Sequence, residues 1–200
     1  MEKIDQIVAC FEKGGTILLP TDTVYGLAAK PLPDSSIAKI FELKSRPRNQ
    51  FLPIMVSSKS ELLALGLEIN INAEKLLNSN LVPGAVTIVF GFDKNADRPS
   101  WLDGREEVAV RIPDDAQLLE ILRRTGPLLV TSANKHQSPG TPNNVNEILQ
   151  QLNGRPDLVV DGGVKQEIPS TIVNCRFESP KIERQGVVDA ADIFNIINNG

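Results

Sequence analysis

Short apolar runs alternate with amphipathic helical segments along the whole chain of 200 residues. Apolar runs bounded by turn residues are typical of buried strands, and apolar residues three and four positions apart are typical of helices. Strands are expected at residues 16–20, 52–56, 85–90, 108–112, 128–131, 158–160 and 170–174. Helices are expected at residues 4–11, 61–65, 73–78, 116–124, 144–152 and 189–197, and between a cap at Asp34 or Ser35 and Pro47. This order predicts an α/β fold with a mixed sheet flanked by helices, in one domain over residues 1–200.

The composition argues against a membrane span, a disulfide framework and a zinc site. No run of about eighteen apolar residues is present, and the first residues include acids where a signal peptide carries only positive charge. We therefore expect a cytoplasmic protein with no membrane partner. The two cysteines, Cys10 and Cys175, stand far apart in the chain, so neither a disulfide framework nor a structural zinc site is indicated.

The charge and the scarcity of histidine exclude further classes of function. The formal net charge of −4 gives no general attraction to nucleic acid, so any RNA contact must be local. The single histidine, His136, excludes a metal site built from several histidines. Neither the P-loop nor the Rossmann glycine pattern occurs, so phosphate binding has to come from side chains.

A basic tripeptide, Lys44-Ser45-Arg46, lies at the exit of the second expected helix, just before Pro47. Arg48 follows, and an extended segment would place these alternate side chains on one side. An ammonium and a forked guanidinium can share one polyphosphate. Charge runs are usually solvated surface, so the tripeptide alone favours a phosphate site and a solvated turn about equally.

Hydroxyl and amide groups follow the expected strand 128–131. Thr131, Ser132 and Asn134 stand at its carboxyl end, the usual ligand edge of an α/β sheet, although an ordinary turn has the same composition. The polar loop that follows, residues 135–140, is long enough to close over a ligand. We interpret His136 as a residue of this loop.

Two arginines and one polar turn have open interpretations. Arg111 ends a strand on the face opposite Val110, which is either a solvent edge or a carboxylate-binding position. Arg184 is either a surface arginine or a site residue. The segment 21–23 (Thr-Asp-Thr) follows the first expected strand, and such residues most often close a turn with their side chains.

Seven short motifs stand in a fixed order along the chain. They are residues 19–27 (LPTDTVYGL), 44–47 (KSRP), 83–87 (PGAVT), 110–113 (VRIP), 132–134 (SAN), 169–171 (PST) and 184–186 (RQG). In this order they resemble the YrdC-like family of threonylcarbamoyl-adenylate synthases, in its short bacterial form, over nearly the whole chain. The resemblance implies a twisted mixed sheet flanked by helices, with a concave basic cleft.

The family's signature is a Lys-x-Arg with a later Ser-x-Asn, and this chain has all four residues. The resemblance implies catalytic roles for Lys44 and Arg46. It implies contacts to ATP from Arg46, Gln50, Thr87, Ser132, Asn134, Gly140 and Arg184. It implies contacts to L-threonine from Thr23, Arg111 and Ser170, with Arg111 paired to the carboxylate. No metal ligand is assigned.

The activity implied by the resemblance joins L-threonine, bicarbonate and ATP, with release of pyrophosphate. The product, L-threonylcarbamoyl-adenylate, is the activated intermediate for N6-threonylcarbamoyladenosine in tRNA. This chemistry needs dense positive charge and precise placement but no protein nucleophile. Mg²⁺ is expected with ATP, and the expected partners are threonylcarbamoyl transferase proteins and tRNA or other structured RNA.

The chain departs from the family's pattern at four places. Longer members have a histidine where Met55 stands, Phe51 replaces a small residue or proline, the loop 135–140 differs, and Asp115 stands where many relatives have a histidine. Met55 and the altered loop leave one alternative, a relative with a shifted carbamoyl-type substrate. The concave basic surface that the resemblance implies leaves a second, an RNA-binding module of the same fold without synthase activity. The acidic net charge counts against the second alternative.

Overall fold

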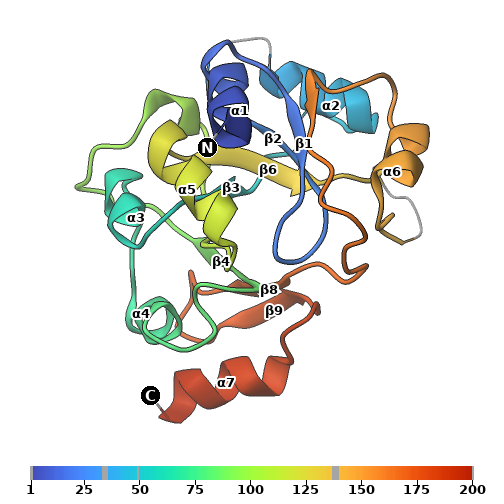
Figure 1. Ribbon diagram of the computed structural model, residues 1–200. Helices are drawn as coiled ribbons and strands as arrows, with labels where there is room; N and C mark the ends of the chain where they lie inside the picture. The colour runs from blue at the N-terminus through green and yellow to red at the C-terminus, as the bar shows by residue number, and fades with distance from the viewer. Residues whose placement is uncertain (1, 33–35, 49, 137–139, 200) are drawn as a thin grey trace.

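The computed structural model describes residues 2–32, 36–48, 50–136 and 140–199, which form a mixed sheet flanked by helices (Figure 1). Within these ranges nine strands form one sheet, in the order β7-β1-β2-β6-β3-β5-β4-β8-β9. The strands are β1 (Ile17–Leu19), β2 (Gly26–Ala29), β3 (Ile54–Met55), β4 (Val86–Phe90), β5 (Val108–Arg111), β6 (Leu128–Ser132), β7 (Leu158–Val159), β8 (Thr171–Asn174) and β9 (Lys181–Arg184). The helices are α1 (Glu2–Glu12), α2 (Ser36–Lys44), α3 (Ser60–Ala64), α4 (Ile71–Leu77), the 3₁₀ helix η1 (Ser100–Leu102), α5 (Ala116–Thr125), α6 (Val145–Gln151) and α7 (Ala190–Asn199).

The half of the sheet built from β1, β2 and β6 is covered on both faces. On one face α1 and α5 lie side by side, and their side chains pack against inward residues such as Ile17 and Val130. On the other face, Leu18 and Leu27 pack against residues of α2 and α6. Because successive side chains of a strand point to opposite faces and both faces are covered, these short strands are apolar except at the end of β6, where Thr131 and Ser132 stand.

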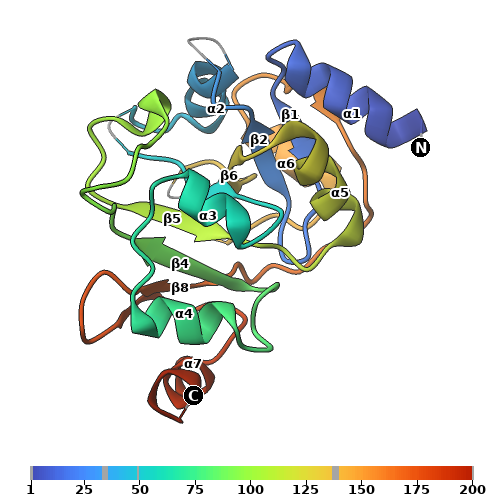
Figure 2. The same cartoon turned by 90° about the vertical axis from the view of Figure 1, so that its left-hand side faces the viewer.

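The other half of the sheet is covered by helices α3, α4 and α7 on one face (Figure 2). Ile88, Val110 and Val173 point into this core, and complete burial of such a side chain stabilises the fold by about 1.5–3 kcal/mol. The residues that alternate with them point to the opposite face. That face carries the cavity described below.

Two strands were not expected from the sequence. Strand β2 consists of glycine, leucine and two alanines and lacks the β-branched residues that mark a strand, yet it pairs with both β1 and β6. Strand β9 is mostly exposed and carries charged residues, because it forms an edge of the sheet. Strand β2 is held by its pairing with the distant strand β6, and β9 by its antiparallel pairing with the preceding strand β8, rather than by their own composition.

Helix boundaries agree with the expected ones to within a few residues. Helix α1 ends just before Gly14, which adopts a φ of 75°, the left-handed conformation that commonly follows a helix end. The expected caps Asp34 and Ser35 lie outside the described residues. None of the helices in the described part of the chain has the length and apolar character needed to span a bilayer.

Candidate active site

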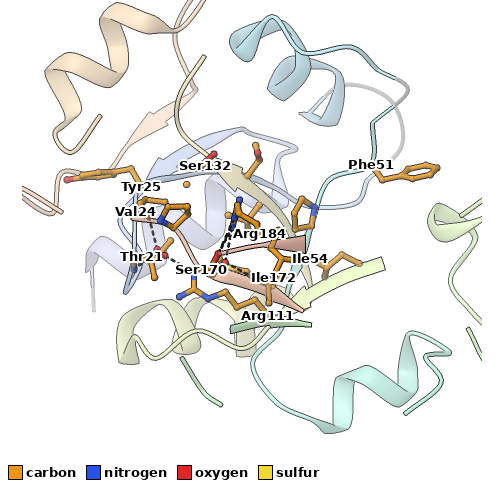
Figure 3. A pocket seen from close by; sticks show the side chains of 18 of the residues that line it. Thr21, Val24, Tyr25, Phe51, Ile54, Arg111, Ser132, Ser170, Ile172 and Arg184 are labelled. Carbon is orange, nitrogen blue, oxygen red and sulfur yellow. Dashed lines mark hydrogen bonds between the residues drawn. The ribbon is translucent and has the colours of Figure 1, made fainter. Parts of the chain in front are cut away.

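A cavity of about 250 Å³ opens on the second face of the sheet (Figure 3). Its floor comes from alternate residues of neighbouring strands: Met55, Arg111, Thr87, Ile172 and Arg184. Its walls come from Thr21, Thr23, Val24, Tyr25, Gly26, Arg46, Phe51, Pro53, Ile54, Val130, Thr131, Ser132, Pro169 and Ser170. All seven motifs contribute to this lining, so folding brings together residues that are far apart in the chain.

Arg111 is buried at the floor of the cavity, with 5% of its side chain exposed. Its Nε donates to the backbone oxygen of Gly84 at 2.8 Å, its Nη1 to Thr23 Oγ1 at 2.7 Å and its Nη2 to Asp22 Oδ2 at 2.8 Å. Burial lowers the pKa of Arg111, and the Asp22 carboxylate opposes this shift. The expected position opposite Val110 is confirmed, and the alternative of a solvent edge is excluded.

A second group of polar side chains joins β4, β8 and β9. The hydroxyl oxygens of Thr87 and Ser170 lie 2.7 Å apart. Arg184 Nη2 donates to the backbone oxygen of Ser170 at 2.7 Å and to its hydroxyl at 3.2 Å. Arg184 and Arg111 both line the cavity. Burial lowers the pKa of Arg184, and the nearby cation of Arg111 lowers it further.

The basic tripeptide is not an extended segment, so that part of the sequence interpretation is wrong. Lys44 is the last residue of α2, and Ser45 adopts a left-handed φ of 51°, as no other non-glycine residue does in the described ranges. The backbone N–H of Arg46 then donates to the oxygen of Phe41 at 2.9 Å, a bond typical of a left-handed helix end. The side chains of Lys44 and Arg46 therefore point in different directions because the helix ends between them, and not because of strand alternation.

Arg46 lines the cavity from this helix end and is half-buried. Its Nη1 donates to Thr131 Oγ1 at 3.4 Å and its Nη2 to the backbone oxygen of Phe51 at 3.1 Å. Its Nε is buried and has no partner among the described residues. Burial lowers the pKa of this group. A buried donor without a protein partner is costly, so this nitrogen is available to a ligand.

Lys44 does not line the cavity as described. Its ammonium is buried and donates to the backbone oxygen of Ser132, to that of Asn134 at 2.6 Å, and to Asn134 Oδ1 at 3.3 Å. The Ser132 hydroxyl also donates to Asn134 Oδ1, at 2.6 Å. Lys44 thus ties the end of α2 to the Ser-x-Asn turn, and Ser132 remains in the cavity wall.

Other predicted residues lie outside the cavity in the described part of the chain. Gln50 and Gly140 are exposed, and Asn134 faces Lys44. Arg48 is also exposed and forms a 2.9 Å ion pair with Glu42. No described group of three or more His, Cys, Asp or Glu residues could hold a metal ion.

Sequence reasoning missed Asp22 and the role of Tyr25. Asp22 was interpreted as a turn residue, but its carboxylate forms a buried ion pair with Arg111. Tyr25 is one of the lining residues, and its hydroxyl donates to the backbone oxygen of Gly163 at 2.7 Å and accepts from the N–H of Gly162 at 2.8 Å. An acid between two threonines after a buried strand was the available signal for Asp22.

Ser45 supplies a test of the left-handed helix end. A left-handed φ is strained for a β-branched residue and relaxed for glycine. We therefore expect Ser45→Val to lower the free energy of unfolding by about 1–2 kcal/mol, and Ser45→Gly to preserve it or raise it by less than about 1 kcal/mol. Urea denaturation measures both values. The Ser45 side chain is exposed, so equal stability of the two variants would contradict the backbone explanation.

The buried ammonium of Lys44 predicts a pH dependence of stability. Burial, followed by the charge of Arg46, lowers the pKa of Lys44 to about 7. Above that pH the unfolded chain still binds a proton that the folded chain has lost, so stability rises with pH. Relative to Lys44→Met, we expect the wild type to gain about 1 kcal/mol per pH unit between roughly pH 7.5 and 9. Urea denaturation at several pH values measures the difference. A flat difference would show that the three oxygen acceptors keep the ammonium charged.

Known proteins resemble this chain over nearly its whole length. The family model Sua5_yciO_yrdC, described as telomere recombination, matches residues 9–186. A threonylcarbamoyl-AMP synthase of Bacillus subtilis is 30% identical over 197 residues, which are 98% of this chain and 56% of that protein. The Escherichia coli K12 protein YciO, described as uncharacterized, is 28% identical over 93% of this chain and 90% of its own length.

A solved structure has the same fold. The crystal structure of P. abyssi Sua5 complexed with L-threonine superimposes with a TM-score of 0.86 at 28% identity, covering 98% of this chain and 58% of that one. This match confirms the expected twisted mixed sheet flanked by helices. The chain therefore spans a little more than half the length of the synthase and of this structure, and about nine-tenths of YciO.

Proposed function

Because the chain belongs to the Sua5/YciO/YrdC family, we propose that it is an L-threonylcarbamoyl-adenylate synthase. In this reaction L-threonine, bicarbonate and ATP are joined and pyrophosphate is released. The observation that carries the proposal is the charge of the cavity. In the described ranges its lining contains three arginines and no acidic side chain, which suits a substrate rich in phosphate and carboxylate groups.

The floor around Arg111 suits the amino-acid substrate. Arg111 has five N–H groups, of which three are used by Gly84, Asp22 and Thr23, so each terminal nitrogen keeps one for a ligand. Two such donors match the two oxygens of one carboxylate. The neighbouring hydroxyls of Thr23 and Ser170 are suitable partners for the amine and hydroxyl of threonine.

Arg46 and Arg184 suit the triphosphate. Neither forms an ion pair with a carboxylate among the described residues, and both line the cavity. The unpartnered Nε of Arg46 can donate to a phosphate oxygen without breaking a protein hydrogen bond. Guanidinium groups with forked donors match phosphate geometry better than ammonium groups do.

These residues account for the reaction by placement and charge. The amine of threonine takes up bicarbonate to give a carbamate and water, and a carbamate oxygen then attacks the α-phosphorus. The bond from that phosphorus to the β-phosphate bridge breaks, and pyrophosphate carries away the charge. We propose that Arg46 stabilises this charge, while Lys44 holds the turn that carries Ser132 in place. No protein nucleophile is needed.

The described donor set does not fit a Mg²⁺ ion held by the protein, since Mg²⁺ prefers carboxylate ligands and no carboxylate lines the cavity. The proposal therefore treats Mg²⁺ as a companion of ATP and routes no step through a protein-bound ion. Threonylcarbamoyl transferases and tRNA would consume the adenylate, and a cytoplasmic location would supply all three substrates.

Pyrophosphate release tests this function directly. It should require ATP, L-threonine and bicarbonate together and should fall to background when any one of them is omitted. Release that does not depend on threonine or bicarbonate would refute the synthase. Steeply salt-dependent tRNA binding without such release would favour the RNA-binding alternative.

Met55 favours one second candidate, a synthase with a shifted amino-acid substrate. Its side chain lines the cavity and lies on the strand next to Arg111, with which it is in register. An apolar thioether there can contact a substrate side chain that is less polar than threonine's. Calorimetric titration with threonine, serine and valine distinguishes the two candidates, because tighter binding of valine would support the shift.

A further inference from the structure

The carboxylate of Asp22 lies behind Arg111 and does not line the cavity as described. Its Oδ2 accepts from Arg111 Nη2 at 2.8 Å and from the backbone N–H of Asp114 at 3.0 Å. The two side chains of this ion pair are 11% and 5% exposed. Asp22 therefore contacts the cavity only through Arg111.

This arrangement fixes the orientation of the guanidinium group. The backbone oxygen of Gly84 holds Nε, Thr23 holds Nη1 and Asp22 holds Nη2, so each nitrogen of the fork has one protein acceptor. A planar group held at three points cannot rotate about its stem. The remaining N–H of each terminal nitrogen then has a fixed direction, which recognition of a carboxylate requires.

Asp22 also sets the charge at this part of the cavity. Its carboxylate neutralises Arg111, whereas Arg46 and Arg184 have no acidic partner among the described residues. A neutral ion pair attracts a zwitterionic amino acid without attracting a second polyphosphate. The two substrate classes are thereby directed to different cations.

The bonding of Asp22 argues against a purely stabilising role. Its Oδ1 is buried and has no hydrogen-bond partner among the described residues. Buried carboxylates that only stabilise a fold usually have both oxygens paired, and a buried ion pair by itself is weak support for stability.

We propose that Asp22 is a positioning residue, which acts through Arg111 to make the site selective for the carboxylate of its amino-acid substrate. This inference rests on the proposed synthase function, because it assigns the amino acid to Arg111. It adds a residue and a source of specificity to that site.

The test compares wild type with Asp22→Asn, which removes the charge and keeps the shape. We expect the KM for L-threonine to rise at least about tenfold while the KM for ATP changes less than about twofold. L-Threoninol, in which an alcohol replaces the carboxylate, provides the second readout. Calorimetry should show that Asp22→Asn loses affinity for L-threonine and keeps its affinity for L-threoninol. The discrimination between these two ligands, measured as the ratio of their affinities, should therefore fall about tenfold.

The chain offers a matched control in Asp157. Its carboxylate also accepts a backbone N–H, from Thr16 at 2.8 Å, and pairs with a cation, Lys39, but it does not line the cavity. Asp157→Asn should leave both KM values and the discrimination unchanged. If Asp22→Asn does not fold, Asp22→Glu keeps the charge and displaces Arg111, and it should weaken threonine binding without affecting ATP.

Several results would overturn the proposal. A folded Asp22→Asn with unchanged discrimination would show that Arg111 needs no such partner. Tighter threonine binding would show that Asp22 competes with the substrate's carboxylate, and an equal loss of threonine and ATP binding would indicate a merely structural role. If the wild type releases no threonine-dependent pyrophosphate, the synthase function fails separately, and the calorimetric comparison still tests Asp22.

Discussion

Replacing Arg111 by lysine is expected to lower kcat/KM for L-threonine by about a hundredfold, or about 2.7 kcal/mol of transition-state binding. Lysine keeps the charge and can still pair with Asp22. It cannot also donate to Gly84 and Thr23 while offering two parallel N–H groups to a carboxylate. The loss should appear chiefly in the KM for threonine, because the interaction is formed on binding.

Initial rates of pyrophosphate release at varied threonine measure this effect. Arg124→Lys is a suitable control, since Arg124 forms a 2.7 Å ion pair with Asp5 and does not line the cavity. That control should leave the rate within about twofold of wild type. If Arg111→Lys changed only the KM for ATP, this arginine would bind the nucleotide, and its proposed place in the amino-acid site would be contradicted.

Removing the side chain of Arg46 is expected to lower threonine-dependent pyrophosphate release at least tenfold at saturating substrates, the scale of one lost charge contact in a transition state. The proposal places this guanidinium beside the charge that develops on the leaving phosphates. Its contacts with Thr131 and Phe51 are long or to backbone, so Arg46→Ala removes little stabilising interaction. The loss should therefore appear in kcat rather than in folding.

Arg48→Ala is the matched control for Arg46→Ala. The two arginines are close in sequence, but Arg48 is exposed and paired with Glu42. An exposed ion pair contributes little to stability, so this variant should behave as wild type. Unchanged turnover in Arg46→Ala, or an equal loss in Arg48→Ala, would refute a specific role for Arg46.

The fold was largely predictable because most of its elements have local signals. The buried strands β4, β5 and β6 are mostly apolar and bounded by turn residues, and a glycine, Gly14, follows the end of α1. Strands β2 and β9 were missed since their residues do not favour a strand and pair only because of their neighbours. Sequence patterns carry no information on such pairing.

The candidate site was predictable in its chemistry and less so in its geometry. Alternation along β5 placed Arg111 opposite Val110, and the structure confirms that face. The direction of the Lys44 side chain depends on the left-handed conformation of Ser45 at the helix end, and the tripeptide sequence does not predict that conformation. The partnership of Asp22 and Arg111 joins residues 89 positions apart and leaves no local pattern.

The sequence by itself determined the alternation of strands and helices and the presence of cationic and hydroxyl side chains in the motifs, because both depend on residue types at short spacing. Only the tertiary structure decided which of the cations face the cavity. It paired Arg111 with a buried carboxylate, turned Lys44 toward backbone oxygens and left the Nε of Arg46 without a partner among the described residues. The physical reason is that desolvation and pairing energies are set by neighbours in space, which strand order across the sheet brings together.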